Sequence, residues 1–291
     1  MKKTLALLLA LVMIFALAAC GQKPAPAAEK QKFIMGIDPE YPPFSYLGDD
    51  GSYTGFDVEV CQAVCDYLGW KLELFGVNWD EKLVQLDSFE CDCVWSGMTI
   101  LDSMKEAGYV ISEPYYDNTQ VLVVKSDSGY ASSADLAGKV VAVQLGTSGE
   151  ALLNGDLADL AGKIVAVQLG TSGESLLNGD LKEMADTFDS VLTCDSFLKC
   201  FTELQGGAVD AVFVDMPVAA SYVAKHDGLN IIDEDLGAEQ YGIAFRSGDA
   251  ELCKTVDEAV QALVENGAYA KIAEKEEYAD IVNNLLFLNK E

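Results

Sequence analysis

Short apolar runs alternate with longer amphipathic stretches along most of the chain. The runs at 32–37 (KFIMGI) and 71–77 (KLELFGV) have the length and the apolar content of buried strands. Between them, apolar residues recur at helical spacing after Gly55, and Gly69 is suited to the left-handed end of that helix. This alternation predicts β-α-β units, and therefore an α/β fold with mostly parallel sheets flanked by helices.

A second α/β series follows later in the chain. We expect strands at 140–146, 190–195 and 208–215, a helix from Ser196 to Leu204, and a further helix opened by Pro217. At 291 residues and 50% hydrophobic content, the chain is long enough to build two lobes, each with its own core.

One strand-turn-helix unit occurs twice in tandem, at 135–158 and 159–182. The two copies differ only at Val140/Ile164, Ala151/Ser175 and Ala158/Lys182, so 21 of 24 positions match. Two copies are too few for a solenoid, so we interpret the repeat as a duplication inside the second lobe. Loops accept such extra length at small entropic cost, although the added unit could also impair the movement of the lobes.

The N-terminus has the features of a secretory signal. Two lysines precede an apolar stretch that ends in small residues at Cys20, and the LAAC-Gly sequence there resembles a bacterial lipobox. This predicts a signal peptide at 1–20, lipidation of Cys20 and a Pro/Ala tether at 21–31. The alternative is an ordinary signal that is cut elsewhere. We expect the protein on the outer face of the cytoplasmic membrane, touching it only through the anchor.

Composition narrows the classes of partner. A formal net charge of −28 argues against nucleic acid and anionic lipid as partners.

Seven cysteines remain after Cys20, and we expect most of them to pack as small hydrophobic residues. The sequence leaves open whether Cys194 and Cys200 form a disulfide. His226 is the only histidine, and the cysteines lack metal-ligand spacing, so neither a metal nor a cofactor is predicted.

Several motifs follow one another along the chain between about residues 32 and 273. They are GIDPEYPPFSY, GFDVEVCQAVCDYL, WSGMTI, SEPYYDN, DLAGKVVAVQLGTSGE, VDAVFVDMPVAASYV and YGIAFRSGDAEL. In sequence and in order, these motifs resemble a known family, the bacterial ABC-transporter solute-binding proteins of family 3, which bind polar amino acids.

The resemblance implies a two-lobe type II periplasmic-binding-protein fold. Lobe 1 would comprise 32–121 plus 241–291, and lobe 2 would comprise 122–240. Strands within 118–124 and 239–245 would cross between the lobes as the hinge. A monomer of this kind would trap an amino acid between the lobes and deliver it to a membrane permease.

The GTSG turn is the expected site for the ligand's carboxylate. Glycines let the backbone approach closely, and successive N–H groups at a helix N-terminus attract an anion. The turn is also explained by a strand-to-helix connection with a Ser/Thr cap. Because the turn is duplicated, two sets of residues compete for the role, and we favour the second copy. These sets are Gly170, Thr171 and Ser172, with Gly146, Thr147 and Ser148 as the alternate.

Asp215 is the expected partner of the ligand's ammonium group. It ends an apolar strand, and ligands of open α/β sheets bind at the carboxyl ends of strands. The alternative is that Asp215 caps the helix begun by Pro217, and both roles are compatible. Asp210 has no such position and is expected to be structural or solvated.

In the first lobe, the resemblance implies contacts from two segments. Asp38, Tyr41 and Phe44 follow a strand, where an acid and an aromatic ring would meet the ligand's side chain, although Phe44 suits the core equally well. Ser96, Gly97 and Thr99 would hold the ligand's amino and carboxylate ends.

The arginine that the family usually carries after its SGMT motif is missing here. Met104 or Lys105 occupies that place, and the sole arginine, Arg246, lies in another motif. Lys105 would supply charge without the planar fork of an arginine. The alternatives to transport are a ligand-sensing or adhesive surface lipoprotein, and a catalytic relative such as a dehydratase. The sequence shows no nucleophile-histidine arrangement, so we expect no enzyme, and Asp38 favours a polar or cationic amino acid.

Overall fold

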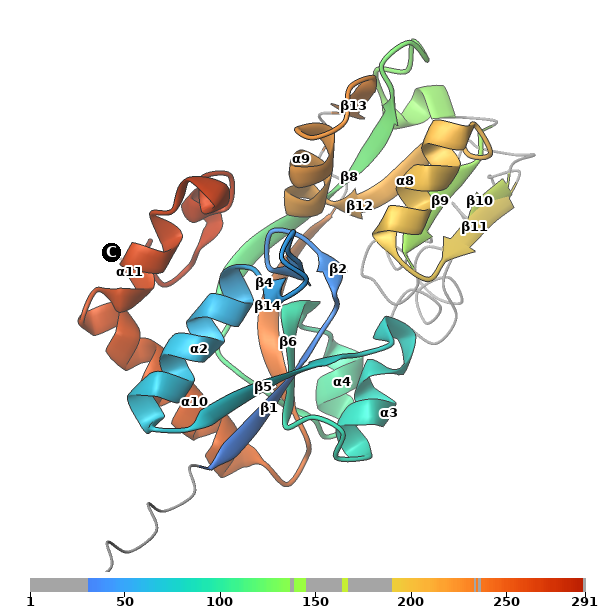
Figure 1. The fold of residues 1–291 in the computed structure, drawn as a ribbon. Helices are drawn as coiled ribbons and strands as arrows, with labels where there is room; N and C mark the ends of the chain where they lie inside the picture. The colour runs from blue at the N-terminus through green and yellow to red at the C-terminus, as the bar shows by residue number, and fades with distance from the viewer. Residues whose placement is uncertain are drawn as a thin grey trace, which may run out of the picture. The chain divides into compact units, whose positions relative to one another are not determined.

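The structure is a computed structural model. It describes residues 31–136, 139–144, 164–166, 190–232, 234 and 237–289. The predicted signal peptide, Cys20, residues 21–30 of the predicted tether, and both GTSG turns lie outside these residues. From Lys32 onward the chain forms one compact unit, which contains two groups of elements (Figure 1).

The first group is built on a three-stranded parallel arrangement with β1 in the centre. Strand β1 (Lys32–Ile37) pairs in parallel with β5 (Lys71–Gly76) and β6 (Cys93–Thr99). A small antiparallel sheet follows β1, made of β2 (Glu40–Tyr41), β3 (Ser45–Leu47) and β4 (Tyr53–Thr54). The helical elements of this group are α2 (Phe56–Leu68), η1 (Trp79–Glu81), α3 (Lys82–Asp87), α4 (Asp102–Glu106), α10 (Ala250–Glu265), α11 (Ala268–Ala273), η3 (Glu276–Tyr278) and η4 (Val282–Asn284).

Helix α2 shows how the local sequence dictates this structure. Its apolar residues at helical spacing are buried, among them Val60 and Val64. The chain ends the helix at Gly69, which has the left-handed conformation with φ 71° and ψ 22°. The helix predicted between Gly55 and Gly69 is therefore confirmed.

The second group has a parallel core of its own. Strand β9 (Val141–Gln144) pairs in parallel with β11 (Ser190–Cys194) and with β12 (Ala211–Asp215). The other elements are η2 (Ser133–Leu136), β10 (Ile164–Ala166), α8 (Phe197–Gly206), α9 (Met216–Val223) and β13 (Leu229–Ile232). Helix α8 begins where the sequence predicts, with the Ser196 hydroxyl accepting a hydrogen bond from the Lys199 N–H at 3.3 Å.

Two long strands join the groups. Strand β8 (Tyr116–Lys125) pairs through its first residues with β14 (Ala238–Phe245) and through its second half with β12. On its other edge, β14 pairs with β6 of the first group. The short β7 (Val110–Ile111) pairs with the end of β14 on the same edge as β8. These are the two crossover strands that the sequence predicts.

The two strands of the duplicated unit occupy different places. Strand β9, from the first copy, lies between β11 and β12. Strand β10, from the second copy, stands at the end of the described strand order, beside β11. The first copy therefore supplies the strand that neighbours β12.

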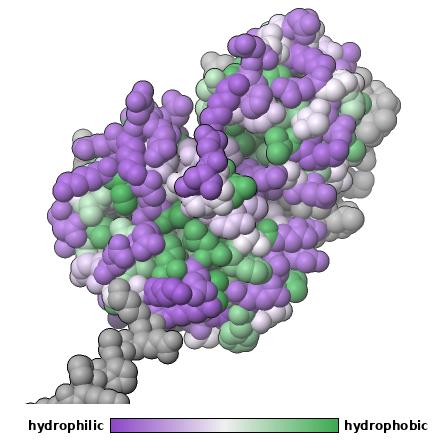
Figure 2. All heavy atoms as spheres, viewed as in Figure 1, coloured by the Kyte–Doolittle hydropathy of each residue, from purple (hydrophilic) through white to green (hydrophobic). Residues whose placement is uncertain are grey.

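The seven described cysteines are buried free thiols, including Cys194 and Cys200, so the disulfide left open by the sequence is not formed in this structure. Among the helices that the structure describes, none combines the length and apolar character needed to cross a membrane. Hydrophilic residues are spread over the face seen in Figure 2, with hydrophobic residues between them.

Candidate functional site

The register of the crossover strands gathers a set of polar side chains at the end of β12. Asp215, the last residue of β12, lies opposite Gln120 of β8. Two residues earlier on β8, Asn118 lies opposite Glu239 of β14. Residues two apart on a strand share one face, so three strands bring these four side chains together.

The Asp215 carboxyl group is buried and surrounded by hydrogen-bond donors. Its Oδ1 accepts bonds from Asn118 Nδ2 at 2.7 Å, Gln120 Nε2 at 2.7 Å and the Tyr241 hydroxyl at 2.8 Å. Asp215 stands at the N-cap of α9, but its side chain makes no capping hydrogen bond. The capping alternative for this side chain is therefore wrong, and its bonds go to the crossover strands instead.

A second carboxyl group adjoins Asp215. Glu239 Oε1 accepts from the same two amides, Asn118 Nδ2 at 2.6 Å and Gln120 Nε2 at 3.1 Å. Burial raises the pKa of Asp215, while its hydrogen bonds, including one with Glu239, act in the opposite direction. Among the described residues, the groups around Asp215 are thus two amides, tyrosine hydroxyls and another carboxyl, and none of these carries a positive charge.

Tyr41 extends this network, whereas Phe44 belongs to the core. The Tyr41 and Tyr241 hydroxyls lie 2.6 Å apart, which links β2 to the group around Asp215. The Tyr41 ring also lies 6.0 Å from the ring of Phe197, at the start of α8. Phe44 is fully buried against the rings of Tyr116 and Tyr241, so the structure gives it the packing role that the sequence left open.

Asp38 connects the first group of elements to the second. Its Oδ2 accepts a 2.8 Å hydrogen bond from Gln144 Nε2, at the end of β9, and its Oδ1 accepts from the Glu40 N–H at 2.8 Å. Burial raises the pKa of Asp38 to about 6, although both of these bonds favour the charged form. Like Asp215, Asp38 is therefore a buried carboxyl group at the ends of the strands.

Neighbouring segments of the first group form hydrogen bonds with the end of β6. The Ser96 hydroxyl accepts from the Asp38 N–H at 3.0 Å and lies 2.5 Å from the Ser45 hydroxyl. The Gly97 N–H donates to Asp57 Oδ2 at 2.8 Å. Thr99 is half-buried at the end of the strand. Within the described structure, Ser96 Oγ and the Gly97 N–H are thus used by protein partners.

Asp57 stands out among the residues that hold β6. Its side chain is fully buried in the first turn of α2, and its Oδ2 also accepts a 2.7 Å bond from the Tyr115 hydroxyl. Burial raises the pKa of Asp57 to about 7, and the hydrogen bonds from Tyr115 and Gly97 oppose that rise. Its place in the first turn of α2 also sets the carboxyl group at the positive end of the helix dipole.

Neither residue at the expected arginine position reaches this network through a described contact. Lys105 is exposed on α4, where its Nζ lies 3.2 Å from Asp102 Oδ1. Met104, on the other side of the helix, packs in the hydrophobic core of the first group. The helical turn separates the two side chains by about 100°, and this accounts for their opposite environments.

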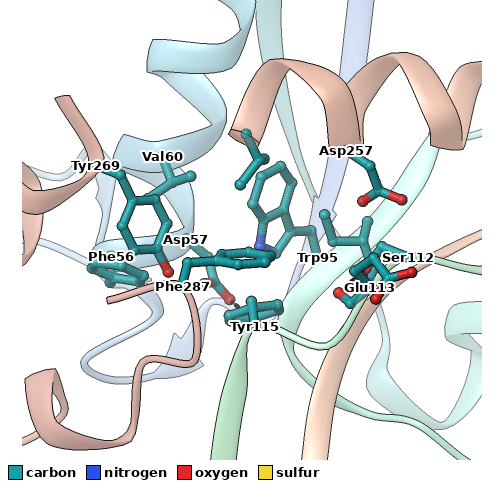
Figure 3. Close-up of a pocket in the computed structure, with 12 residues that line it drawn as sticks. Phe56, Asp57, Val60, Trp95, Ser112, Glu113, Tyr115, Asp257, Tyr269 and Phe287 are labelled. Carbon is teal, nitrogen blue, oxygen red and sulfur yellow. Dashed lines mark hydrogen bonds between the residues drawn. The ribbon is translucent and has the colours of Figure 1, made fainter. Parts of the chain in front are cut away.

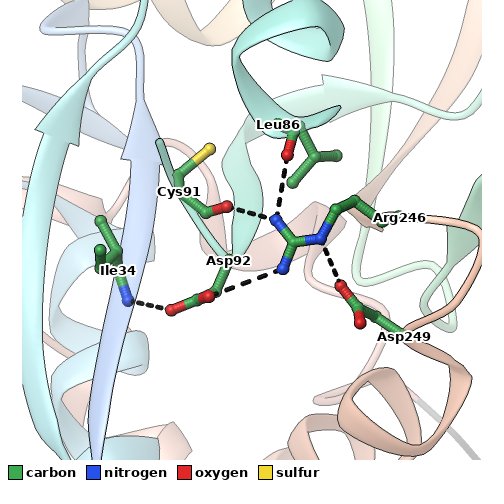
Figure 4. A network of polar contacts seen from close by, with 6 residues as sticks. All are labelled: Ile34, Leu86, Cys91, Asp92, Arg246 and Asp249. Carbon is green, nitrogen blue, oxygen red and sulfur yellow. Dashed lines mark hydrogen bonds and ion pairs between the residues drawn. The ribbon is translucent and has the colours of Figure 1, made fainter. Parts of the chain in front are cut away.

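Arg246 is committed to a structural network (Figure 4). Its Nη1 donates to the carbonyl oxygens of Leu86 at 3.0 Å and Cys91 at 2.6 Å. Ion pairs join its Nε to Asp249 at 2.7 Å and its Nη2 to Asp92 at 3.6 Å. The sole arginine therefore ties the segment before β6 to the start of α10.

Some expected residues can be placed and others cannot. Asp210 accepts a 2.7 Å bond from the Val140 N–H, in keeping with the structural role expected for it. The two alternative anion-binding sets lie outside the described residues, so their role stays a prediction. They are Gly146, Thr147 and Ser148, and Gly170, Thr171 and Ser172.

Sequence reasoning missed the polar partners on the crossover strands. Asn118, Gln120 and Glu239 lie in the predicted hinge strands and Gln144 lies in the strand predicted at 140–146, and the sequence assigns none of them to the site. One signal was available, because polar residues at alternate positions in an otherwise apolar strand share a face. Within the described part of the chain, no group of His, Cys, Asp and Glu side chains is arranged to hold a metal ion.

Two α/β groups joined by two crossover strands, with polar side chains gathered at the strand ends, define the type II periplasmic-binding-protein fold. A family model for the bacterial extracellular solute-binding proteins, family 3, matches residues 33–276. The chain belongs to this family, as the motifs in the sequence indicated.

Similar proteins of known name include two curated relatives and a solved structure. The L-cystine-binding protein TcyJ of Escherichia coli (strain K12) is 32% identical, with 87% of this chain and 85% of that protein covered. The arginine-binding extracellular protein ArtP of Bacillus subtilis (strain 168) is 32% identical, with 94% and 98% covered. An ancestral arginine-binding protein bound to arginine is 31% identical, with a TM-score of 0.69 and coverage of 84% and 97%.

Proposed function

We propose that this protein captures a small amino acid and delivers it to the membrane permease of an ABC importer. The observation that carries the proposal is the buried Asp215 carboxyl at the carboxyl end of β12, which forms no ion pair with a cation of the described residues. A ligand ammonium group would supply the missing positive charge through charge-assisted hydrogen bonds.

The charges at the strand ends support a polar or cationic side chain in the ligand. Asp38 adds a second buried carboxyl group to that of Asp215, and the α-ammonium group needs only one of them. The relatives named for arginine and L-cystine are consistent with a ligand that carries more than one ammonium or guanidinium group. Tyr41 would bring an aromatic ring to the same ligand.

The ligand's carboxylate would bind the N–H groups of a GTSG turn, and strand order favours the first copy. Strand β9 leads toward Gly146 and neighbours β12, so its carboxyl end lies at the same sheet edge as Asp215. Strand β10 leads toward Gly170 from beyond β11. This reverses the preference suggested by the sequence alone, and it makes Lys105 unnecessary for anion binding.

Thr147→Ala is accordingly expected to weaken ligand binding about tenfold, through the loss of a hydroxyl donor to a charged group. Thr171→Ala, the matched change in the other copy, should alter the dissociation constant by less than about twofold. Isothermal titration of both variants compares the copies directly. A larger loss in Thr171→Ala would assign the site to the second copy.

The remaining parts of the proposal rest on the N-terminal sequence and the family. Lipidation at Cys20 would hold the protein outside the cytoplasmic membrane as a monomer, and residues 21–31 would give it reach toward the permease. We propose binding rather than catalysis, since the relatives are named as binding proteins. In the described structure, the His226 ring stacks on the Tyr222 ring, and its Nδ1 lies 2.9 Å from the Tyr222 carbonyl oxygen.

A thermal-shift screen of the purified protein against the twenty amino acids tests the proposal. A ligand at 100 times its dissociation constant stabilises the folded state by about 2.7 kcal/mol. For a chain of this size, that corresponds to a rise in melting temperature of roughly 5–10 °C. We expect this rise with at least one polar or cationic amino acid. A flat response to all twenty would overturn the proposed function.

A further inference from the structure

A small internal cavity lies behind β6, among residues of α2, β6, α10 and α11. It offers about 10 Å³ of space to the centre of a water-sized sphere, which is close to the space that one water molecule occupies. Phe56, Val60 and Phe287 form part of its apolar wall, and Asp57, Trp95 and Tyr269 also line it (Figure 3).

Three polar atoms at this cavity lack a hydrogen-bond partner of good geometry. They are Asp57 Oδ1, Trp95 Nε1 and the Tyr269 hydroxyl. The Trp95 side chain lies near enough to Asp57 to favour the charged form of its carboxyl group, but without the geometry of a full hydrogen bond. The three side chains are 0%, 2% and 1% exposed, so bulk water does not reach them. In Figure 3 the Tyr269 hydroxyl and the indole nitrogen both lie on the side of the cavity where Asp57 stands. A buried polar atom without a hydrogen-bond partner costs free energy of folding. Three such atoms around one cavity indicate that they share a partner inside it.

The chemistry of the three atoms matches a water molecule. A carboxylate oxygen only accepts, an indole N–H only donates, and a tyrosine hydroxyl does both. A water molecule can donate to Asp57, accept from Trp95 and bond to Tyr269 in either direction. A metal cation does not fit, because the indole would direct a hydrogen atom at it.

We propose that this cavity binds one water molecule through Asp57, Trp95 and Tyr269, and that Asp57 with this water positions the Gly97 peptide. The second oxygen of Asp57 already accepts from the Gly97 N–H at 2.8 Å and from the Tyr115 hydroxyl at 2.7 Å. With the water on Oδ1, both carboxylate oxygens are satisfied, and the side chain is fixed in orientation.

Gly97 needs such support because its backbone is unusual. Its φ is +52°, a conformation that side chains disfavour, and an added Cβ would lie 2.3 Å from the Tyr41 ring. The side chain of the preceding residue, Ser96, accepts a hydrogen bond from the Asp38 N–H. Asp57 is therefore a positioning residue that acts on the strand end through Gly97, and its effect on ligand affinity rests on the proposed function.

Two measurements on the ligand-free protein test the proposal. A high-resolution crystal structure should show a water molecule within hydrogen-bond distance of all three polar atoms, and an empty cavity would overturn the assignment. Amide exchange followed by NMR should show the Gly97 N–H exchanging about tenfold faster in Asp57→Asn, relative to the other amides of β6, since a neutral acceptor binds it more weakly.

Tyr269→Phe should speed Gly97 exchange in the same sense, because it removes one of the bonds that hold the water. Tyr278→Phe is the matched control. Both rings pack edge-on against Phe56, but the Tyr278 hydroxyl bonds to Glu59, outside this cavity. Equal exchange of Gly97 in the two variants would refute the role of the water. Neither measurement uses a ligand. Failure of this proposal can therefore be distinguished from failure of the amino-acid screen.

Discussion

Replacing Asp215 by asparagine is expected to lower the affinity for the amino-acid ligand by at least about thirtyfold. The change keeps the size and the acceptor oxygen that Asn118, Gln120 and Tyr241 use, but it removes the negative charge. Losing one member of a buried, hydrogen-bonded charge pair costs about 2–5 kcal/mol, mostly through faster dissociation. Isothermal titration with the ligand identified by the screen measures the loss.

Asp210→Asn is the matched control, because Asp210 immediately precedes the same strand and bonds to the Val140 N–H instead. It should leave the dissociation constant within about twofold of the parent value. Without ligand, Asp215→Asn should be at least as stable as the parent at pH 8, since it removes a carboxyl whose ionisation burial opposes. An unchanged affinity in Asp215→Asn would remove the basis of the proposed function.

The direction in which ligand affinity changes with pH follows from the Asp215 carboxyl group. Burial raises the pKa of Asp215, so the ligand-free carboxyl retains a proton to a higher pH than an exposed aspartate does. An ammonium group binds the charged form, and ligand affinity should therefore fall as the pH is lowered through that raised pKa. Asp215→Asn should weaken this dependence, and a remainder would come from Asp38, whose pKa burial raises to about 6.

The local pattern of the sequence was sufficient to predict the main elements, but not the short strands such as β2, β3 and β4. Apolar spacing between Gly55 and Gly69 specifies α2, because glycine readily adopts the conformation that ends it. Asp215 could be singled out because the end of a parallel strand is a recurrent ligand position. The neighbours of Asp215 could not, because they depend on strand register across about a hundred residues, as between Asp215 and Gln120.

Other differences have equally physical causes. Phe44 and Tyr41 follow the same strand, yet only packing in three dimensions decides that Phe44 enters the core while Tyr41 joins the hydroxyl network. Met104 and Lys105 could have been separated by helical periodicity, since adjacent residues point about 100° apart. The partnership of Asp57 with Gly97 joins two motifs 40 residues apart, and neither motif specifies the other.

Arg246→Met is expected to lower the free energy of unfolding by about 3–5 kcal/mol. Methionine fills most of the space, but it leaves the carbonyl oxygens of Leu86 and Cys91 without their donor and Asp249 without its cation. Removing one partner of a buried charged network is costly for this reason. Urea denaturation followed by circular dichroism measures the change.

Lys199→Met provides the comparison, since the Lys199 ammonium group is exposed to solvent where it pairs with Glu203 on α8, and losing this pair should change stability far less than losing Arg246. Arg246→Lys separates charge from geometry. A lysine keeps the cation but cannot donate from a planar fork to Leu86 and Cys91 while pairing with Asp249, so we expect an intermediate loss of stability. Because this network does not include Asp215 or Asp38, both Arg246 variants should bind ligand with the parent affinity wherever they are folded. Ligand affinity that fell while stability held would instead make the sole arginine part of the binding site.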